Sequence, residues 1–139
     1  MDDETMRLIG LLAISSILLT GCSSSPISAG DADSVPPARL YAFPSGGGTQ
    51  LVVTRDSGML GAACNHRLYI DGTLAAELST GEVARFGLEP GKHVIGVTPS
   101  SACGGGGLVE TEVEMKPGES VRRRISVTLG GIAVTPTAF

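Results

Sequence analysis

Val109-Glu110-Thr111-Glu112-Val113-Glu114-Met115-Lys116, followed by Pro117-Gly118, is the stretch that decides the fold of this chain. Apolar or neutral side chains alternate with charged ones, which is the period of a β-strand with one buried and one wet face. Pro117-Gly118 is a turn signal. A second alternation follows over residues 121–129, with Val121, Ile125, Val127 and Leu129 set against Arg122, Arg124, Ser126 and Thr128. We therefore predict an antiparallel hairpin over residues 109–129.

Charge pairing across this hairpin follows from matching its two faces. The match places Glu114 opposite Arg122 and Glu112 opposite Arg124, and each such pair contributes about 0.2–1 kcal/mol. Arg123 falls on the apolar side, so we expect it at a sheet edge or with its guanidinium extended outward to water.

Further strands are expected on both sides of the hairpin. Short alternating segments predict strands at 38–43, 50–55, 66–70, 74–78, 82–88 and 92–98, and a short final strand at 132–134. Asp71-Gly72 predicts a tight turn because Gly accepts a positive φ, and Pro90-Gly91 predicts another. Seven to nine short strands without a convincing helix after residue 21 predict an all-β fold, a small antiparallel β-sandwich over residues 38–139.

The N-terminal segment has the features of an export signal. Residues 8–19 are uncharged and end in Leu19-Thr20-Gly21-Cys22, and they are too few to span a bilayer as a helix, which takes about 20 residues. The sequence Leu-Thr-Gly-Cys resembles the lipobox of bacterial lipoproteins. That resemblance implies a signal peptide over residues 1–21 that is cleaved off, and lipid on Cys22. Because residues 1–5 include three acidic side chains and an export signal starts positive, we expect translation to start at Met6.

The residues after Cys22 indicate which membrane holds the lipid anchor and how the anchor is connected to the domain. Ser23 stands where lipoproteins retained at the inner membrane tend to have Asp, so the resemblance implies the outer membrane of a Gram-negative bacterium. Residues 23–37 are mostly small and polar and contain three prolines. A segment of this composition buries little apolar surface. We predict a flexible tether over residues 22–37 with a span of about 20 Å.

Composition bounds the remaining chain to one small domain. Removal of residues 1–21 from the 139-residue chain leaves 118 residues with 11 acidic and 9 basic side chains and no Trp. A net charge near −2 without aromatic platforms predicts no nucleic-acid partner. With Cys22 acylated, Cys64 and Cys103 remain, and an oxidising compartment favours a disulfide between them. Two buried free thiols are the alternative.

Two turn motifs carry a second resemblance. Tyr69-Ile70-Asp71-Gly72 is followed about 20 residues later by Leu88-Glu89-Pro90-Gly91-Lys92-His93. The pair resembles PEGA-type domains and a related domain-of-unknown-function family of small bacterial lipoproteins, although the Pro-x-Gly stretch of PEGA domains is absent. The resemblance implies a transthyretin-like or immunoglobulin-like sandwich at the cell envelope without enzyme activity. The residues of the turn motif are Asp71, Gly72, Pro90, Gly91 and His93.

Two groups of residues have types that are suited to binding a metal or a phosphate. Cys64, His66, His93 and Cys103 are ligand types for zinc or copper, but their spacing matches no finger motif. The run Gly104–Gly107 lacks the Lys-Ser/Thr of a phosphate loop, and we expect a hairpin loop beside the disulfide. We therefore predict no metal and no cofactor.

Catalytic and lipid-binding patterns are equally weak. No Gly-x-Ser-x-Gly elbow is present, and Glu110, Glu112 and Glu114 suit a solvated strand. The run Arg122–Arg124 could contact anionic lipid, but facing glutamates would neutralise it in part.

The sequence as a whole predicts a non-enzymatic lipoprotein of the outer membrane. Its sandwich would serve as a structural or protein-interaction module facing the periplasm, with the membrane bound through lipid and an envelope protein as partner. The alternative is a periplasmic inhibitor or ligand-binding lipoprotein that uses the 99–107 loop. A metal-binding envelope protein is a minor alternative.

Overall fold

The computed structural model describes residues 24–103 and 106–139. These residues form nine strands and two short 3-10 helices and no α-helix. The predicted signal peptide, Cys22 and residues 104–105 lie outside the described residues. In the part of the chain that is described, no helix has the length and apolarity needed to cross a bilayer. The elements are β1 (Asp33–Ser34), η1 (Pro37–Arg39), β2 (Gln50–Arg55), β3 (His66–Ile70), β4 (Thr73–Leu78), β5 (Glu82–Gly87), β6 (Gly91–Pro99), η2 (Ser101–Cys103), β7 (Val109–Met115), β8 (Ser120–Thr128) and β9 (Gly131–Pro136).

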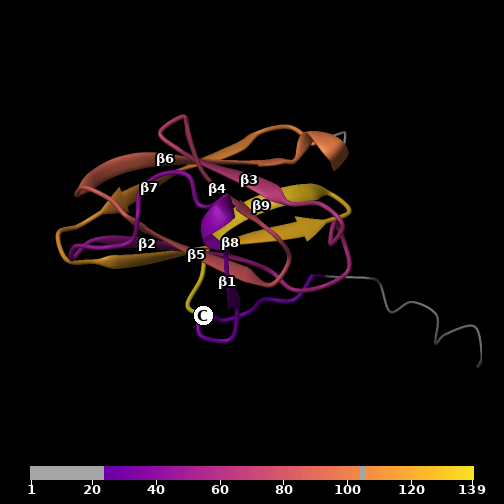
Figure 1. The fold of residues 1–139 in the computed structure, drawn as a ribbon, viewed down its shortest axis with the longest axis horizontal. Helices are drawn as coiled ribbons and strands as arrows, with labels where there is room; N and C mark the ends of the chain where they lie inside the picture. Colours follow the sequence, from indigo (N-terminus) through magenta and orange to yellow (C-terminus); the bar gives the residue numbers. More distant parts are fainter. Residues whose placement is uncertain (1–23, 104–105) are drawn as a thin grey trace, which may run out of the picture.

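Two sheets packed face to face make up the domain (Figure 1). One has five strands in the order β1-β5-β2-β8-β9, and the other has four in the order β4-β3-β6-β7. The predicted all-β sandwich is confirmed. The five-stranded sheet is mixed rather than fully antiparallel, because β1 pairs with β5 and β2 with β8 in parallel.

The core lies between the two sheets and follows the alternation of each strand. Leu51, Val53, Phe86 and Ile125 face it from the five-stranded sheet, and each is almost fully buried. The four-stranded sheet contributes Leu68, Ile70, Leu78, Ile95, Val97, Val113 and Met115. Gly87 has to be a glycine, because a Cβ there would lie 2.7 Å from the carbonyl oxygen of Gly46.

The predicted hairpin over residues 109–129 does not form. Both strands are present, but β7 pairs with β6, whereas β8 pairs with β2 and β9. The Pro117-Gly118 turn therefore carries the chain from one sheet to the other. Alternation fixes which face of each strand is buried, and a turn of this kind can join strands within a sheet or across the sandwich. Leu129, predicted on the apolar face, is 95% exposed at the tip of the β8–β9 hairpin.

The predicted charge pairs fail for the same reason. Lys92 of β6 lies 3.0 Å from Glu112, and Arg124 binds Asp56 at 2.7 Å. Arg123 points to the core side, as its position in the alternation indicates, but it is only half-buried. It lies in β8, which is an inner strand of the sheet, and its guanidinium donates to the carbonyl of Arg122 at 3.0 Å.

Residues 38–43, predicted as a strand, instead contain the end of η1 and a single bridge between Leu40 and Ala76. The physical reason is Pro37, whose fixed φ suits the first position of a helical turn. The remaining predicted strands are present with boundaries shifted by two residues or fewer.

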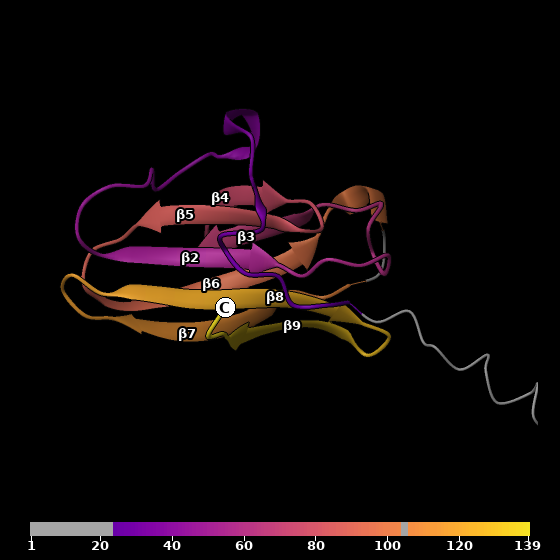
Figure 2. The same ribbon diagram turned by 90° about the horizontal axis from the view of Figure 1, so that it is seen from below.

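Within the predicted flexible tether, the described residues 24–37 lie on the domain instead. Asp33 and Ser34 add a short parallel strand to β5, and the side chain of Val35 is 4% exposed. The indigo segment crosses the outer face of the five-stranded sheet (Figure 2). Val52 and Thr54 of β2, which face outward, are buried. Composition missed this because backbone hydrogen bonds and one Val hold a segment that is otherwise small and polar.

Substitution of Val35 by Ala measures how firmly this segment is held. We expect Val35→Ala to lower the free energy of unfolding by about 2 kcal/mol, because two methyl groups leave a packed site. Chemical denaturation checks it, with the exposed Val94→Ala on β6 as the matched control. Equal and small effects for both variants would show that the segment is not packed.

Candidate functional site

The residues singled out in the sequence lie at opposite ends of β3. His66 begins this strand beside the Cys64–Cys103 disulfide, and Asp71 follows its last residue. His93 lies at the same end as Asp71. The structure therefore divides the candidates into a turn end and a disulfide end.

At the turn end, the carboxylate of Asp71 and the imidazole of His93 hold two turns together. Asp71 and Gly72 both have positive φ, at 50° and 79°, as a two-residue hairpin turn requires. His93 Nδ1 lies 2.6 Å from Asp71 Oδ2, and His93 Nε2 lies 2.7 Å from the carbonyl of Glu89, beside Pro90-Gly91. Asp71 Oδ1 accepts the backbone N–H of Val94 at 2.9 Å.

This arrangement favours the charged form of His93. A carbonyl and a carboxylate both accept hydrogen bonds, so both ring nitrogens must carry a proton to donate to them. The hydrogen bond to Asp71 is the main cause that raises the pKa of His93, and the same contact lowers the pKa of Asp71. Both nitrogens are occupied, so the ring serves to fix the turn.

At the disulfide end, Cys64 and Cys103 are bonded, with their Cα atoms 5.9 Å apart. The bridge connects the loop before β3 to η2 and confirms the predicted disulfide. It lines a pocket of about 460 Å³ together with His66, Pro99 and residues of the β8–β9 hairpin. The four candidate metal ligands do not converge, and the described residues contain no cluster of three or more His, Cys, Asp or Glu that could hold a metal.

His66 is buried at the disulfide end, and it differs from His93 in its hydrogen bonding and in the direction of its pKa shift. Its side chain is 3% exposed, and Nδ1 has no hydrogen-bond partner. Burial, reinforced by the nearby positive charge of Arg55, lowers the pKa of His66 to about 4. His66 is therefore neutral at pH 7.

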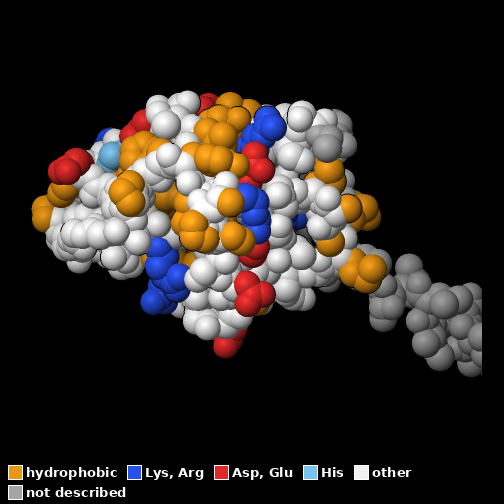
Figure 3. Space-filling view, in the orientation of Figure 1, with side chains coloured by type: hydrophobic (Ala, Val, Ile, Leu, Met, Phe, Trp, Pro, Cys, Tyr) orange, Lys and Arg blue, Asp and Glu red, His pale blue; other side chains and the backbone are white. Residues whose placement is uncertain are grey.

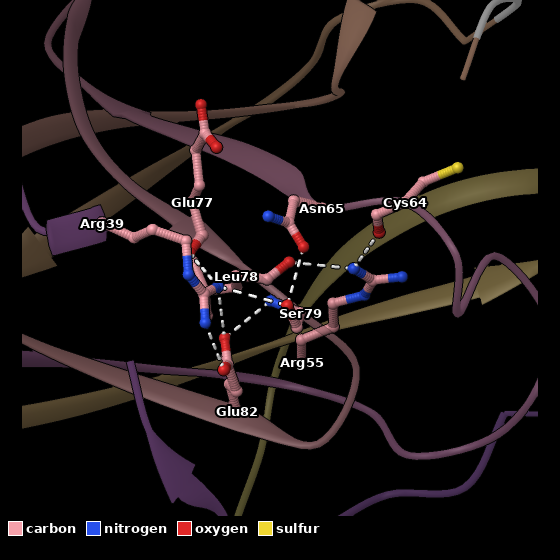
Figure 4. A network of polar contacts seen from close by, with 8 residues as sticks. All are labelled: Arg39, Arg55, Cys64, Asn65, Glu77, Leu78, Ser79 and Glu82. Carbon is pink, nitrogen blue, oxygen red and sulfur yellow. Dashed lines mark hydrogen bonds and ion pairs between the residues drawn. The ribbon is translucent and has the colours of Figure 1, made fainter. Parts of the chain in front are cut away.

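Arg55 is the feature of this end that the sequence did not single out. It is 1% exposed at the end of the core, and its guanidinium donates to three backbone carbonyls, of which Figure 4 shows those of Cys64 and Leu78. These acceptors are Cys64, Gly61 at 2.6 Å and Leu78 at 2.8 Å. Burial lowers the pKa of Arg55 to about 10, which still leaves it charged.

Beside Arg55, an ion pair fastens η1 to the β4–β5 turn (Figure 4). Arg39 binds both carboxylate oxygens of Glu82, at 2.6 and 2.8 Å, and the same carboxylate accepts the N–H of Ser79 at 2.7 Å. Ser79 Oγ donates to the side-chain oxygen of Asn65 at 2.7 Å. Burial is the largest single influence on Glu82 and by itself raises its pKa. The hydrogen bonds from Arg39 and Ser79, with the positive charge of Arg39, together outweigh burial, so the pKa of Glu82 is lowered.

Another paired carboxylate, this one buried, lies under the N-terminal segment. Asp56 is 3% exposed and binds Arg124 through two contacts, at 3.0 and 2.7 Å. The run Arg122–Arg124 is therefore not a free basic patch, because Arg124 is paired in the structure. Glu110, Glu112 and Glu114 are exposed along β7, as expected of a solvated strand.

The two histidines should titrate in opposite directions. We expect NMR titration to give a pKa above 6.5 for His93 and near 4 for His66. The two histidines therefore change the stability of the protein in opposite directions as the pH changes. The contribution of His93 to stability is complete below the pKa of about 6.5 of an unfolded histidine and is lost as the pH rises through its raised folded value. Burial of neutral His66 becomes costly as the pH falls below about 6.5, because only the unfolded state binds the proton readily.

Asp71→Asn is the control for this titration. It removes the carboxylate from His93 and leaves His66 untouched, so only the His93 pKa should move, toward 6.5. A His93 pKa that does not change in Asp71→Asn would show that the contact is not formed in solution.

Comparison of the chain with protein-family models, with curated proteins and with solved structures finds no match.

Proposed function

We propose that this protein is a non-enzymatic lipoprotein of the Gram-negative outer membrane, anchored through Cys22, whose sandwich is a structural or protein-interaction module facing the periplasm. The observation that carries the proposal is Leu19-Thr20-Gly21-Cys22 after the uncharged residues 8–19. The Cys64–Cys103 disulfide supports it, since such bonds persist in oxidising compartments such as the bacterial periplasm.

The polar groups of the domain support a role as a rigid module. Arg39–Glu82, Arg124–Asp56 and His93–Asp71 each join separate segments of the chain. Side chains paired in this way position the backbone, and they hold the loops of the sandwich in place.

An edge strand provides the docking surface in this proposal. β7 is the last strand of its sheet, so its outer edge has backbone groups that a partner strand could pair with. Glu110, Glu112 and Glu114 are exposed along β7, and they favour a basic partner segment.

A pull-down from detergent-solubilised envelope tests the proposal. Acylated full-length protein is compared with Cys22→Ala, which lacks the lipid. We expect a specific envelope protein with the acylated form, and its loss when Glu112→Lys alters the β7 edge. No acyl mass on Cys22 would refute the anchor, and no specific envelope protein would refute the interaction module.

The pocket beside the disulfide favours a second candidate function. It has a volume of about 460 Å³ and lies next to the 99–107 loop, and His66 is one of its lining residues. A periplasmic inhibitor or ligand-binding lipoprotein would use this end. Recovery of a soluble protein with both the acylated and the Cys22→Ala forms would favour this function.

A further inference from the structure

The point at which the chain enters the domain is fixed. The backbone N–H of Ser25 donates to the carbonyl of Ser57 at 2.7 Å, and the N–H of Ser57 donates back at 2.9 Å. Ser57 Oγ adds a third contact to the carbonyl of Ser25 at 3.2 Å. Ser24 Oγ lies 3.4 Å from the carboxylate of Asp56. The chain is therefore held at the beginning of the loop that joins β2 to β3.

Covalent geometry limits how far Cys22 can lie from this point. It precedes Ser25 by three positions, and an extended chain covers at most about 3.6 Å per residue. A lipid on Cys22 would thus be attached within about 11 Å of Ser25. This reach is about half that of the predicted tether, so the adjoining end of the sandwich has to lie close to the bilayer.

That end of the molecule has apolar tips. Met59, two residues after Ser57, is 84% exposed, and Leu129 at the tip of the β8–β9 hairpin is 95% exposed. The two loops are neighbours, because Gly61 and Gly130 line the same pocket. Figure 1 shows the β8–β9 hairpin, η2 and the entering chain at the same end of the sandwich.

Apart from the buried Asp56, which is paired with Arg124, the loops at this end have no charged side chains. Residues 57–65, 94–109 and 125–139 contain no Asp, Glu, Lys or Arg. On the face drawn in Figure 3, the coloured side chains at the right-hand tip are hydrophobic or neutral, and charged side chains lie farther back. The turns at the opposite end carry Glu89, Lys92, Lys116 and Glu119. Charge is thus segregated along the long axis of the sandwich.

We propose that the uncharged end, with Met59 and Leu129 at its tips, rests on and inserts into the lipid surface that holds the acylated Cys22. The proposal rests on the proposed lipid anchor. Apolar side chains gain by entering the boundary between headgroups and acyl chains, and a face without charges avoids the cost of desolvating them. The lipid and the two tips then form one membrane contact, and the pocket at the disulfide end faces the bilayer. The charged end and most of β7 remain accessible from the periplasm.

The absence of Trp from the chain makes the test direct. Single Trp residues are introduced as Met59→Trp, Leu129→Trp and, in the loop before β2, Ser45→Trp. All three sites are exposed, so the fold tolerates the change. The acylated full-length proteins are reconstituted into vesicles of phosphatidylethanolamine and phosphatidylglycerol that contain a phospholipid brominated on its acyl chains. Flotation and intact mass report the anchor in the same samples.

We expect the fluorescence of Met59→Trp and Leu129→Trp to shift to the blue and to be quenched by the brominated lipid. Ser45→Trp should show neither effect, and it controls for the preference of Trp for interfaces. Vesicles that float with the protein but leave the two tips no more quenched than Ser45 would overturn the membrane contact and leave the anchor standing. A protein without acyl mass that does not float would overturn both.

Discussion

Replacement of Arg55 by Ala should lower the free energy of unfolding by about 3–5 kcal/mol, because a buried acceptor left without a donor costs about 1–3 kcal/mol and the missing side chain leaves a cavity. The guanidinium is almost fully buried and donates to the carbonyls of Cys64, Gly61 and Leu78. Alanine would leave these carbonyls without a donor and a cavity at the end of the core, and each effect is costly in a packed interior. Urea denaturation monitored by circular dichroism measures the loss.

Two further variants separate the loss of the hydrogen-bond donors from the loss of the charge and from the general effect of replacing an Arg. Arg55→Lys keeps the charge, but its ammonium does not reproduce the planar fork of donors, so we expect an intermediate loss. Arg85→Ala removes an exposed Arg from the adjacent strand β5 and should change stability by less than about 0.5 kcal/mol. If Arg55→Ala were as mild as Arg85→Ala, the three carbonyl contacts would not hold the loop end together.

The positions of the strands could be predicted from the sequence, whereas their partners could not. The segment 50–55 was expected as a strand and is β2, because alternation depends only on which face is buried. Its parallel pairing with β8 depends on segments 70 residues apart. No local pattern encodes such a contact, and the strong turn at Pro117-Gly118 favoured the wrong neighbour for β8.

In the candidate site, too, the positions of some residues were predictable from the sequence and their contacts were not. The turn residues Asp71 and His93 were found because Gly-containing turns have a sequence signal, but their contact with each other was not predicted. Arg55 was missed because an Arg at the end of a strand reads as solvent-exposed. One signal was available: Arg55 shares the parity of Leu51 and Val53, both fully buried in the structure. A charged side chain in phase with a buried face is the feature that points to a buried polar network.

Loss of the Cys64–Cys103 disulfide should lower the free energy of unfolding by about 4 kcal/mol, the chain-entropy value for a loop of about 40 residues. The two cysteines are 39 residues apart in sequence, and the loop they close contains β3, β4, β5 and β6. The double variant Cys64→Ala/Cys103→Ala shows the effect in urea denaturation. Reduction of the wild-type protein should reproduce it, and the double variant itself should not respond to reductant. A loss below about 1 kcal/mol would contradict the entropic account.

The disulfide and Arg55 should not act independently. The carbonyl that accepts a hydrogen bond from Arg55 belongs to Cys64, so the bridge and the guanidinium hold the same residue. Without the bridge, the loop can move its carbonyls toward water, and Arg55→Ala should then cost less than in the oxidised protein. A double-mutant cycle should show a coupling of about 0.5–3 kcal/mol, the range for residues in one network. Strict additivity would mean that each fastens the loop by itself. Coupling would show that the β2–β3 loop, η2 and the end of the core are one cooperative unit, as a rigid end of the sandwich requires.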